Sequence, residues 1–98
     1  MLETFTHDTF APRIGEPFVI HLDDGSAVET RLSEAQVFGR QAQEGGRSAF
    51  SLLFHGPAHP VLPQRIYRME NEGLGAFELF LVPLGPDGRG MRYEAVFT

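Results

Sequence analysis

The sequence PFVIHLDDGSAVETRLS at residues 17–33 has the pattern of a β-hairpin. Apolar and polar residues alternate on both sides of Asp24-Gly25, so one face of each strand is apolar. An Asp-Gly pair between two alternating segments favours a tight turn, because glycine accepts the positive φ that such a turn requires. Residues 17–22 and 28–33 are therefore predicted to be paired antiparallel strands.

The alternation changes parity near Ser33, at the end of the second strand. Apolar positions that share one face are even-numbered up to Leu32 and odd-numbered from Ala35 onward. A β-bulge accounts for this change, because one extra residue lets a bent strand keep its apolar side inward. Bends of this kind help to close small barrels.

Further segments also alternate and are predicted to be strands: 49–54, 65–69, 76–82 and 91–97. The inward face of 65–69 is ambiguous, because Ile66 has one parity and Tyr67 and Met69 have the other. The segment 76–82 is apolar on both faces, so Phe80 and Val82 should be covered by another element or lie at a subunit contact. The outward charges of these segments are expected to form cross-strand ion pairs among Arg68, Glu78, Arg92 and Glu94.

Two connections and the N-terminal segment lack the alternation. Residues 40–47 contain adjacent glycines and are predicted to be a mobile hairpin loop. Residues 55–63 contain three prolines, which fix φ and withhold backbone donors, so this loop should be stiff. Residues 1–15 are predicted to plug an open end of the β structure, with a helical turn capped by Thr6 and with these apolar side chains: Leu2, Phe5, Phe10 and Ile14.

The chain has 98 residues, the size of one domain, and residues 1–98 are predicted to form a single one. The predicted fold is mainly β: a six-stranded antiparallel meander in up-and-down order, closing into a small barrel with the N-terminal helical turn as its plug. Nine phenylalanines are available for the interior, and a small barrel is filled by its own side chains.

Composition and charge exclude several functions. The chain has no cysteine and no lysine, which removes thiolate metal sites, thiol nucleophiles and Schiff-base chemistry. Its formal net charge of -5 disfavours nucleic acid as a partner, because that affinity comes largely from neutralising phosphates. No apolar run approaches the roughly 20 residues that span a membrane. No secretory signal is visible, so a cytoplasmic location is expected, and no cofactor is implied.

The histidines do not predict a metal or catalytic site. His55 and His59 have the spacing that would align two ligands on a helix, but Gly56 and the neighbouring prolines disfavour a helix there. Two nitrogens without a cysteine or a placed carboxylate form a poor metal site, so hydrogen bonding in the loop is expected instead. No nucleophile elbow, phosphate-binding loop or dinucleotide fingerprint occurs, and the chain is not predicted to be an enzyme.

Several segments together resemble one protein family. They are THDTF at 6–10, FSLLFHGP at 50–57, LPQRIY at 62–67, LFLVPLG at 79–85 and YEAVF at 93–97. Over nearly the whole chain they are similar to the DUF6916 family, small bacterial proteins that share a domain of unknown function. These motifs are strand cores and turns, so the resemblance implies a fold and no catalytic residue. Relatives encoded near phage-tail-collar-like proteins imply a role in assembling or accompanying a tail-like particle.

Three hypotheses for function follow. The first is a noncatalytic protein–protein interaction or assembly module, which contacts a protein partner or a second copy, as in a homodimer, through these residues: Leu53, His55, Pro57, His59, Phe80 and Val82. The second is a small-ligand binder with a cavity inside the barrel or under the N-terminal plug. The third is a hydrolase or metal site around His55 and His59.

Overall fold

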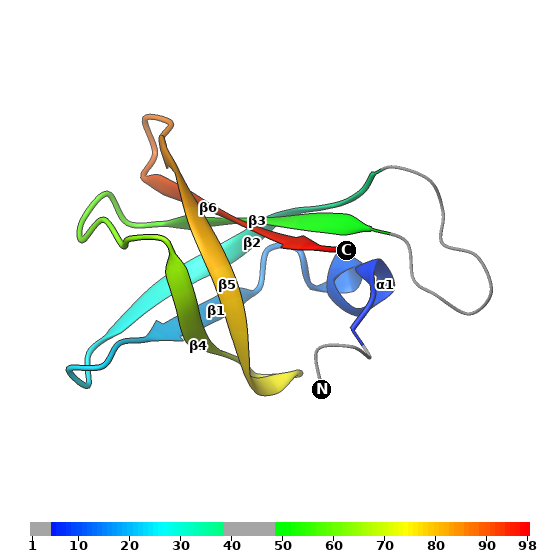
Figure 1. Cartoon of the computed structure of the whole chain (residues 1–98), viewed down its shortest axis with the longest axis horizontal. Coiled ribbons are helices and arrows are strands. Elements are labelled where there is room, and N and C mark those ends of the chain that lie inside the picture. Colours follow the sequence, from blue (N-terminus) through cyan, green and yellow to red (C-terminus); the bar gives the residue numbers. More distant parts are fainter. Residues whose placement is uncertain (1–4, 39–48) are drawn as a thin grey trace.

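Antiparallel strands form a closed barrel in the computed structural model, which describes residues 5–38 and 49–98 (Figure 1). Within these ranges the strands are β1 (Pro17–His21), β2 (Ala27–Val37), β3 (Phe50–Gly56), β4 (Arg65–Asn71), β5 (Gly75–Pro86) and β6 (Met91–Phe97). The mainly β, antiparallel barrel predicted from the sequence is confirmed. The loop predicted at 40–47, and Leu2 of the predicted plug, lie outside the described residues.

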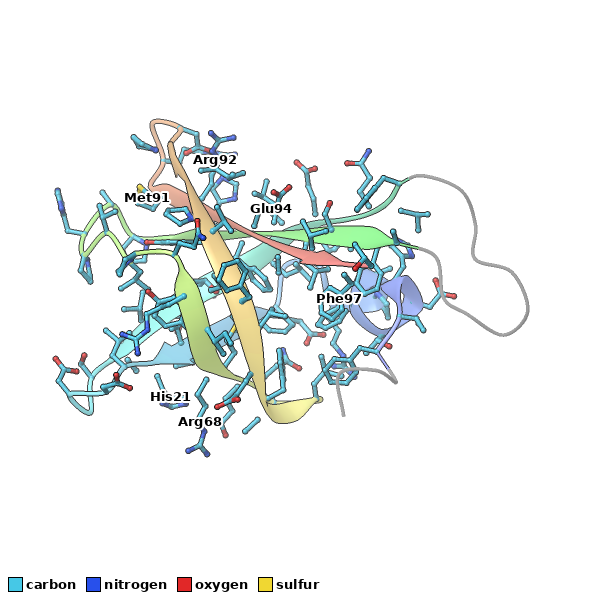
Figure 2. The ribbon with its side chains drawn as sticks, in the orientation of Figure 1. His21, Arg68, Met91, Arg92, Glu94 and Phe97 are labelled. Carbon is cyan, nitrogen blue, oxygen red and sulfur yellow. The ribbon has the colours of Figure 1, made fainter. Side chains whose placement is uncertain are left out.

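The strand order around the barrel is β1-β2-β3-β6-β5-β4, and β4 closes the barrel by pairing with β1. His21 and Arg68 face each other across this closing seam and project outward from it (Figure 2). The predicted up-and-down order was wrong at one connection, because β3 pairs with β6 and not with β4. Residues 57–64 cross one end of the barrel to join β3 to β4, which gives the Greek-key order β4-β1-β2-β3.

The predicted inward faces are the buried ones. On β2, β3 and β5 the buried residues are those of the predicted parity: Val28, Thr30, Leu32, Phe50, Leu52, Phe54, Phe77, Leu79 and Leu81. The bulge is also confirmed, since Leu32 pairs with Phe54 but Glu34 pairs with Leu53, which leaves Ser33 as the extra residue. On β4, where the pattern was ambiguous, Tyr67 and Met69 are buried and Ile66 is exposed.

The N-terminal segment closes one end of the barrel. The helix α1 (His7–Phe10) begins at Thr6, whose backbone N–H donates to the Thr9 hydroxyl at 3.0 Å. Phe10 is fully buried, and its ring packs among those of the strands, including Phe97 of β6, which lies beside α1 (Figure 2). Ile14 was wrongly assigned to the plug: it is 49% exposed, because the backbone becomes extended there and leaves the barrel end.

The proline-rich connection closes the opposite end. Leu62 is buried, and its N–H donates to the Tyr93 hydroxyl at 3.0 Å. The inward side chains and these two closing segments form one buried apolar cluster. None of the helices in the described ranges is long and apolar enough to cross a membrane.

Candidate functional site

The structure divides the predicted interaction residues between two surfaces. Phe80 and Val82 lie on the outer face of β5, and His59 lies beside the end of that strand. Leu53 and His55 lie on the outer side of β3, and Pro57 follows in the crossing loop. In the barrel β3 and β5 are separated by β6, so these residues do not form one continuous patch.

The first surface is apolar and runs along the outside of β4 and β5 into the crossing loop. We call it the β5 face, and it consists of Val61, Ile66, Phe80, Val82 and Leu84. Ile66 and Phe80 stand directly opposite each other on β4 and β5, and they are 59% and 47% exposed. Beyond them, Val61 and Leu84 line an open groove of about 590 Å³.

Charged residues next to the β5 face lack the ion pairs predicted for them. Arg68 and Glu78 are register partners on β4 and β5, yet among the described residues neither takes part in an ion pair. Exposed pairs of this kind gain little in water, since solvent screening and side-chain entropy offset the attraction. Arg92 instead donates from Nε to the Gly85 carbonyl at 3.4 Å.

The second surface is built around His55, near the end of β3. Its imidazole lies 3.0 Å through Nδ1 from the Ser33 hydroxyl and 2.6 Å through Nε2 from the Asp87 carboxylate. Ser33 is the bulge residue of β2, and Asp87 follows β5 in the turn to β6. We call these residues, together with Arg31, Arg89 and Arg92, the His55 cluster.

The hydrogen bonds assign the protons in this cluster. The Ser33 hydroxyl lies 3.0 Å from the Leu53 carbonyl, which can only accept, so the hydroxyl proton goes to that carbonyl. The carboxylate of Asp87 accepts from Nε2–H of His55, and the Ser33 hydroxyl is the partner of Nδ1. Both ring nitrogens of His55 are therefore held by hydrogen bonds.

Asp87 is the carboxylate partner of the His55 imidazole. The hydrogen bond from His55 is the largest cause that lowers the pKa of Asp87 from its ordinary 3.8, and the backbone N–H of Arg89, at 3.0 Å, adds to it. Only 22% of the Asp87 side chain and 21% of the His55 side chain are exposed. The pair therefore ties the β5–β6 turn to β3 with a charge-assisted hydrogen bond.

Arginines flank the imidazole on both sides. Arg31 of β2 and Arg92 of β6 are the register partners of His55, so the three side chains lie on one face of the sheet. Figure 2 shows Arg92 next to the β5–β6 turn, from which Arg89 also extends. Two open clefts, of about 320 and 620 Å³, are both lined by Arg31, His55 and Arg89.

Sequence reasoning found His55 but missed its partners. His59 lines the larger cleft with His55, yet both His55 nitrogens already have partners, and no group of three potential metal ligands occurs among the described residues. Ser33 carried one signal, the parity change that marks a bulge, because bulges often re-aim side chains at functional sites. Asp87 carried no such signal in the sequence. The β5–β6 turn that holds it lies near β3 because β6 pairs with β3, and the alternation pattern does not predict this pairing.

Comparison with known proteins identifies a family. A family model described as a domain of unknown function, DUF6916, matches residues 5–97. No curated protein and no solved structure matches the chain. The family match confirms the resemblance seen in the sequence, and it assigns no ligand, partner or reaction to either surface.

Proposed function

We propose that this chain, which belongs to the DUF6916 family, is a noncatalytic assembly module that pairs with a second copy of itself through the β5 face. The observation that carries the proposal is the exposed pair Ile66 and Phe80, two large apolar side chains directly opposite each other on neighbouring strands. Single exposed apolar residues are ordinary, but a contiguous apolar patch on a small domain is typical of an interaction site.

The charges beside the patch favour a second copy as the occupant. A two-fold axis parallel to the strands and between β4 and β5 places β4 of each copy over β5 of the other. Ile66 then meets Phe80, and Arg68 meets Glu78, a pair of charges that has no ion-pair partner within the described part of one copy. The β5 face is thus complementary to itself, because apolar side chains meet apolar side chains and a positive charge meets a negative one.

The size of the surface is compatible with a specific contact. A standard interface buries about 800 Å² on each partner, which here is about an eighth of the accessible surface of 5958 Å². The outer sides of two strands, extended by Val61 and Leu84, can supply such an area. Family resemblance alone suggests the larger setting, a bacterial tail-like particle in which the paired module is an accessory.

Sedimentation equilibrium over a wide concentration range tests the pairing. The wild type should approach twice its mass of 10.9 kDa as concentration rises, whereas Phe80→Glu should stay monomeric because a carboxylate cannot be buried in the apolar contact. Ile14→Glu is the matched control, since Ile14 is 49% exposed and lies next to β2, on the side of the barrel away from β5. Circular dichroism checks that both variants are folded.

A charge exchange tests the arrangement of the two copies. Glu78→Arg alone should weaken pairing because it sets arginine against Arg68 of the other copy, and the double variant Glu78→Arg with Arg68→Glu should restore it. A wild type that stays monomeric throughout, or an Ile14→Glu variant that is as monomeric as Phe80→Glu, contradicts the proposal.

A further inference from the structure

We infer that the His55 cluster binds the carboxylate of a small organic acid that has an apolar body. The site is separate from the β5 face and does not depend on pairing. The charge of the cluster, its free hydrogen-bond donors and the apolar wall of its cleft each support the inference.

The charge at the cluster is opposite to that of the whole chain. The chain has a net charge of -5 and eight basic side chains besides histidine, yet Arg31, Arg89 and Arg92 lie around one imidazole, that of His55. Among the described residues, the carboxylates within 4 Å of these arginines or of His55 are those of Asp87 and Glu29. Three guanidinium groups against these two carboxylates leave an excess of positive charge, which attracts an anion.

Guanidinium donors remain available at the cleft. Arg89 has an 81% exposed side chain, and its Nη2 lies 3.8 Å from Asp87, which is beyond hydrogen-bond distance. Arg31 is held in place by donating from Nη1 to the Gly15 carbonyl at 2.9 Å, while its Nη2 is 3.6 Å from Glu29. The planar fork of arginine matches a carboxylate in a two-point contact, so these side chains favour that group.

The smaller cleft adds an apolar wall to these donors. Its volume of about 320 Å³ lies at the lower end of the range for small-molecule sites, and Ile14 and Leu32 line it together with the charged groups. Ile14 is half-exposed at this wall, where it follows the N-terminal plug. An acid with a small apolar body would bury that body against Ile14 while its carboxylate meets Arg31 and Arg89.

The same residues do not favour catalysis by Ser33. To act as a nucleophile, a serine must donate its hydroxyl proton to the neighbouring imidazole. The Ser33 hydroxyl instead donates to the Leu53 carbonyl and has Nδ1 of His55 as its second partner. In addition, the backbone N–H of Gly15 in the cleft already donates to the Leu32 carbonyl at 2.7 Å and is unavailable to an oxyanion. The arrangement holds the imidazole in place and does not activate an alcohol.

Titration of the labelled protein with benzoate, followed by amide NMR, tests the inference. Benzoate should shift the amides of Ile14, Ser33 and Arg89 saturably, and benzamide, which has the same body without the charge, should not. Arg89→Gln should weaken benzoate binding about tenfold, the loss expected for one hydrogen bond to a charged group. Arg65→Gln is the matched control, since Arg65 is an exposed arginine of β4 that lies outside the β5 face and lines neither cleft, so its loss should leave the affinity unchanged.

Further arms separate the alternatives. Benzoate should still bind to Phe80→Glu, so that failure of the pairing and failure of this site are distinguishable. The inference is overturned if benzamide shifts the same amides equally, if inorganic phosphate binds and benzoate does not, or if Arg65→Gln weakens binding as much as Arg89→Gln. Covalent labelling of Ser33 by a fluorophosphonate would also overturn it, because the site would then be nucleophilic.

Discussion

Replacement of Phe10 by alanine tests whether the N-terminal plug belongs to the core. Phe10 is fully buried, and its ring centroid lies between 5.3 and 6.3 Å from those of Phe5, Phe18, Phe50, Phe77 and Phe97. Truncation of a buried phenylalanine costs about 3–5 kcal/mol. We expect the upper part of this range, because the aromatic contacts are lost together with the buried area.

Urea and thermal unfolding measure this loss. Each kcal/mol lowers the melting temperature of a domain of this size by about 4–8 °C, so a loss of about 4–5 kcal/mol predicts a decrease of at least about 16 °C. An unchanged m-value indicates a cavity in an otherwise native barrel, whereas a smaller m-value indicates that the plug has left and already exposed its surface. Phe38→Ala is the control, since Phe38 is 42% exposed and should lose about 1–2 kcal/mol, less than half of the loss expected at Phe10. Equal losses in the two variants would refute the reasoning.

Two further predictions concern the β5–β6 turn. Gly90 has a φ of +144°, and a Cβ there would overlap the Gly56 carbonyl. At Gly88 a Cβ meets no atom, so Gly88→Ala adds only the strain of a φ of +90°, about 1–2 kcal/mol. Gly90→Ala should therefore destabilise the protein more than Gly88→Ala. Equal losses in urea would show that the overlap does not matter. Asp87 has a pKa lowered from 3.8 by His55, so its ionised form stabilises the fold above that pH, and this stabilisation disappears as the pH falls through the lowered pKa. Asp87→Asn should therefore melt at a lower temperature than the wild type at neutral pH, with the difference closing below pH 3.8; a constant difference across pH would contradict this.

The faces of the strands were predictable because burial and alternation have the same physical cause. A strand between water and a core must place apolar side chains at every second position, so Phe50, Leu52 and Phe54 indicate their own orientation. The bulge at Ser33 was predictable for the same reason, since only an extra residue allows the parity to change while the core side stays apolar.

The neighbours of each strand were not predictable from this pattern. Alternation states which side of a strand is buried, but it is the same whether β3 pairs with β4 or with β6. Consecutive pairing is the simplest assumption for antiparallel strands, and the proline-rich residues 57–64 gave no indication that they cross the end of the barrel. Their prolines restrict the loop locally and do not determine where it leads.

The candidate site was hidden because its groups are distant in sequence. Ser33 and Asp87 lie 22 and 32 positions from His55, so no local motif contains the three residues. The spacing of His55 and His59 raised a metal site only as a remote alternative to hydrogen bonding within the loop, whereas the imidazole in fact bridges two other elements. Residue types alone indicated hydrogen bonding for His55, but its partners could be identified only once the fold was known.

The strand order that the pattern missed is also what produces the His55 cluster. In a simple meander β3 would pair with β4, and a residue of β4 would stand where Arg92 of β6 faces His55. The β5–β6 turn would then lie away from β3, and Asp87 could not reach the imidazole. Crossing of the barrel end by residues 57–64 thus brings a turn and three basic side chains to one place on an acidic protein. A variant that disrupts this crossing should lose the anion site together with the fold, whereas Arg89→Gln should lose the site alone, and this difference separates a binding site from a structural charge network.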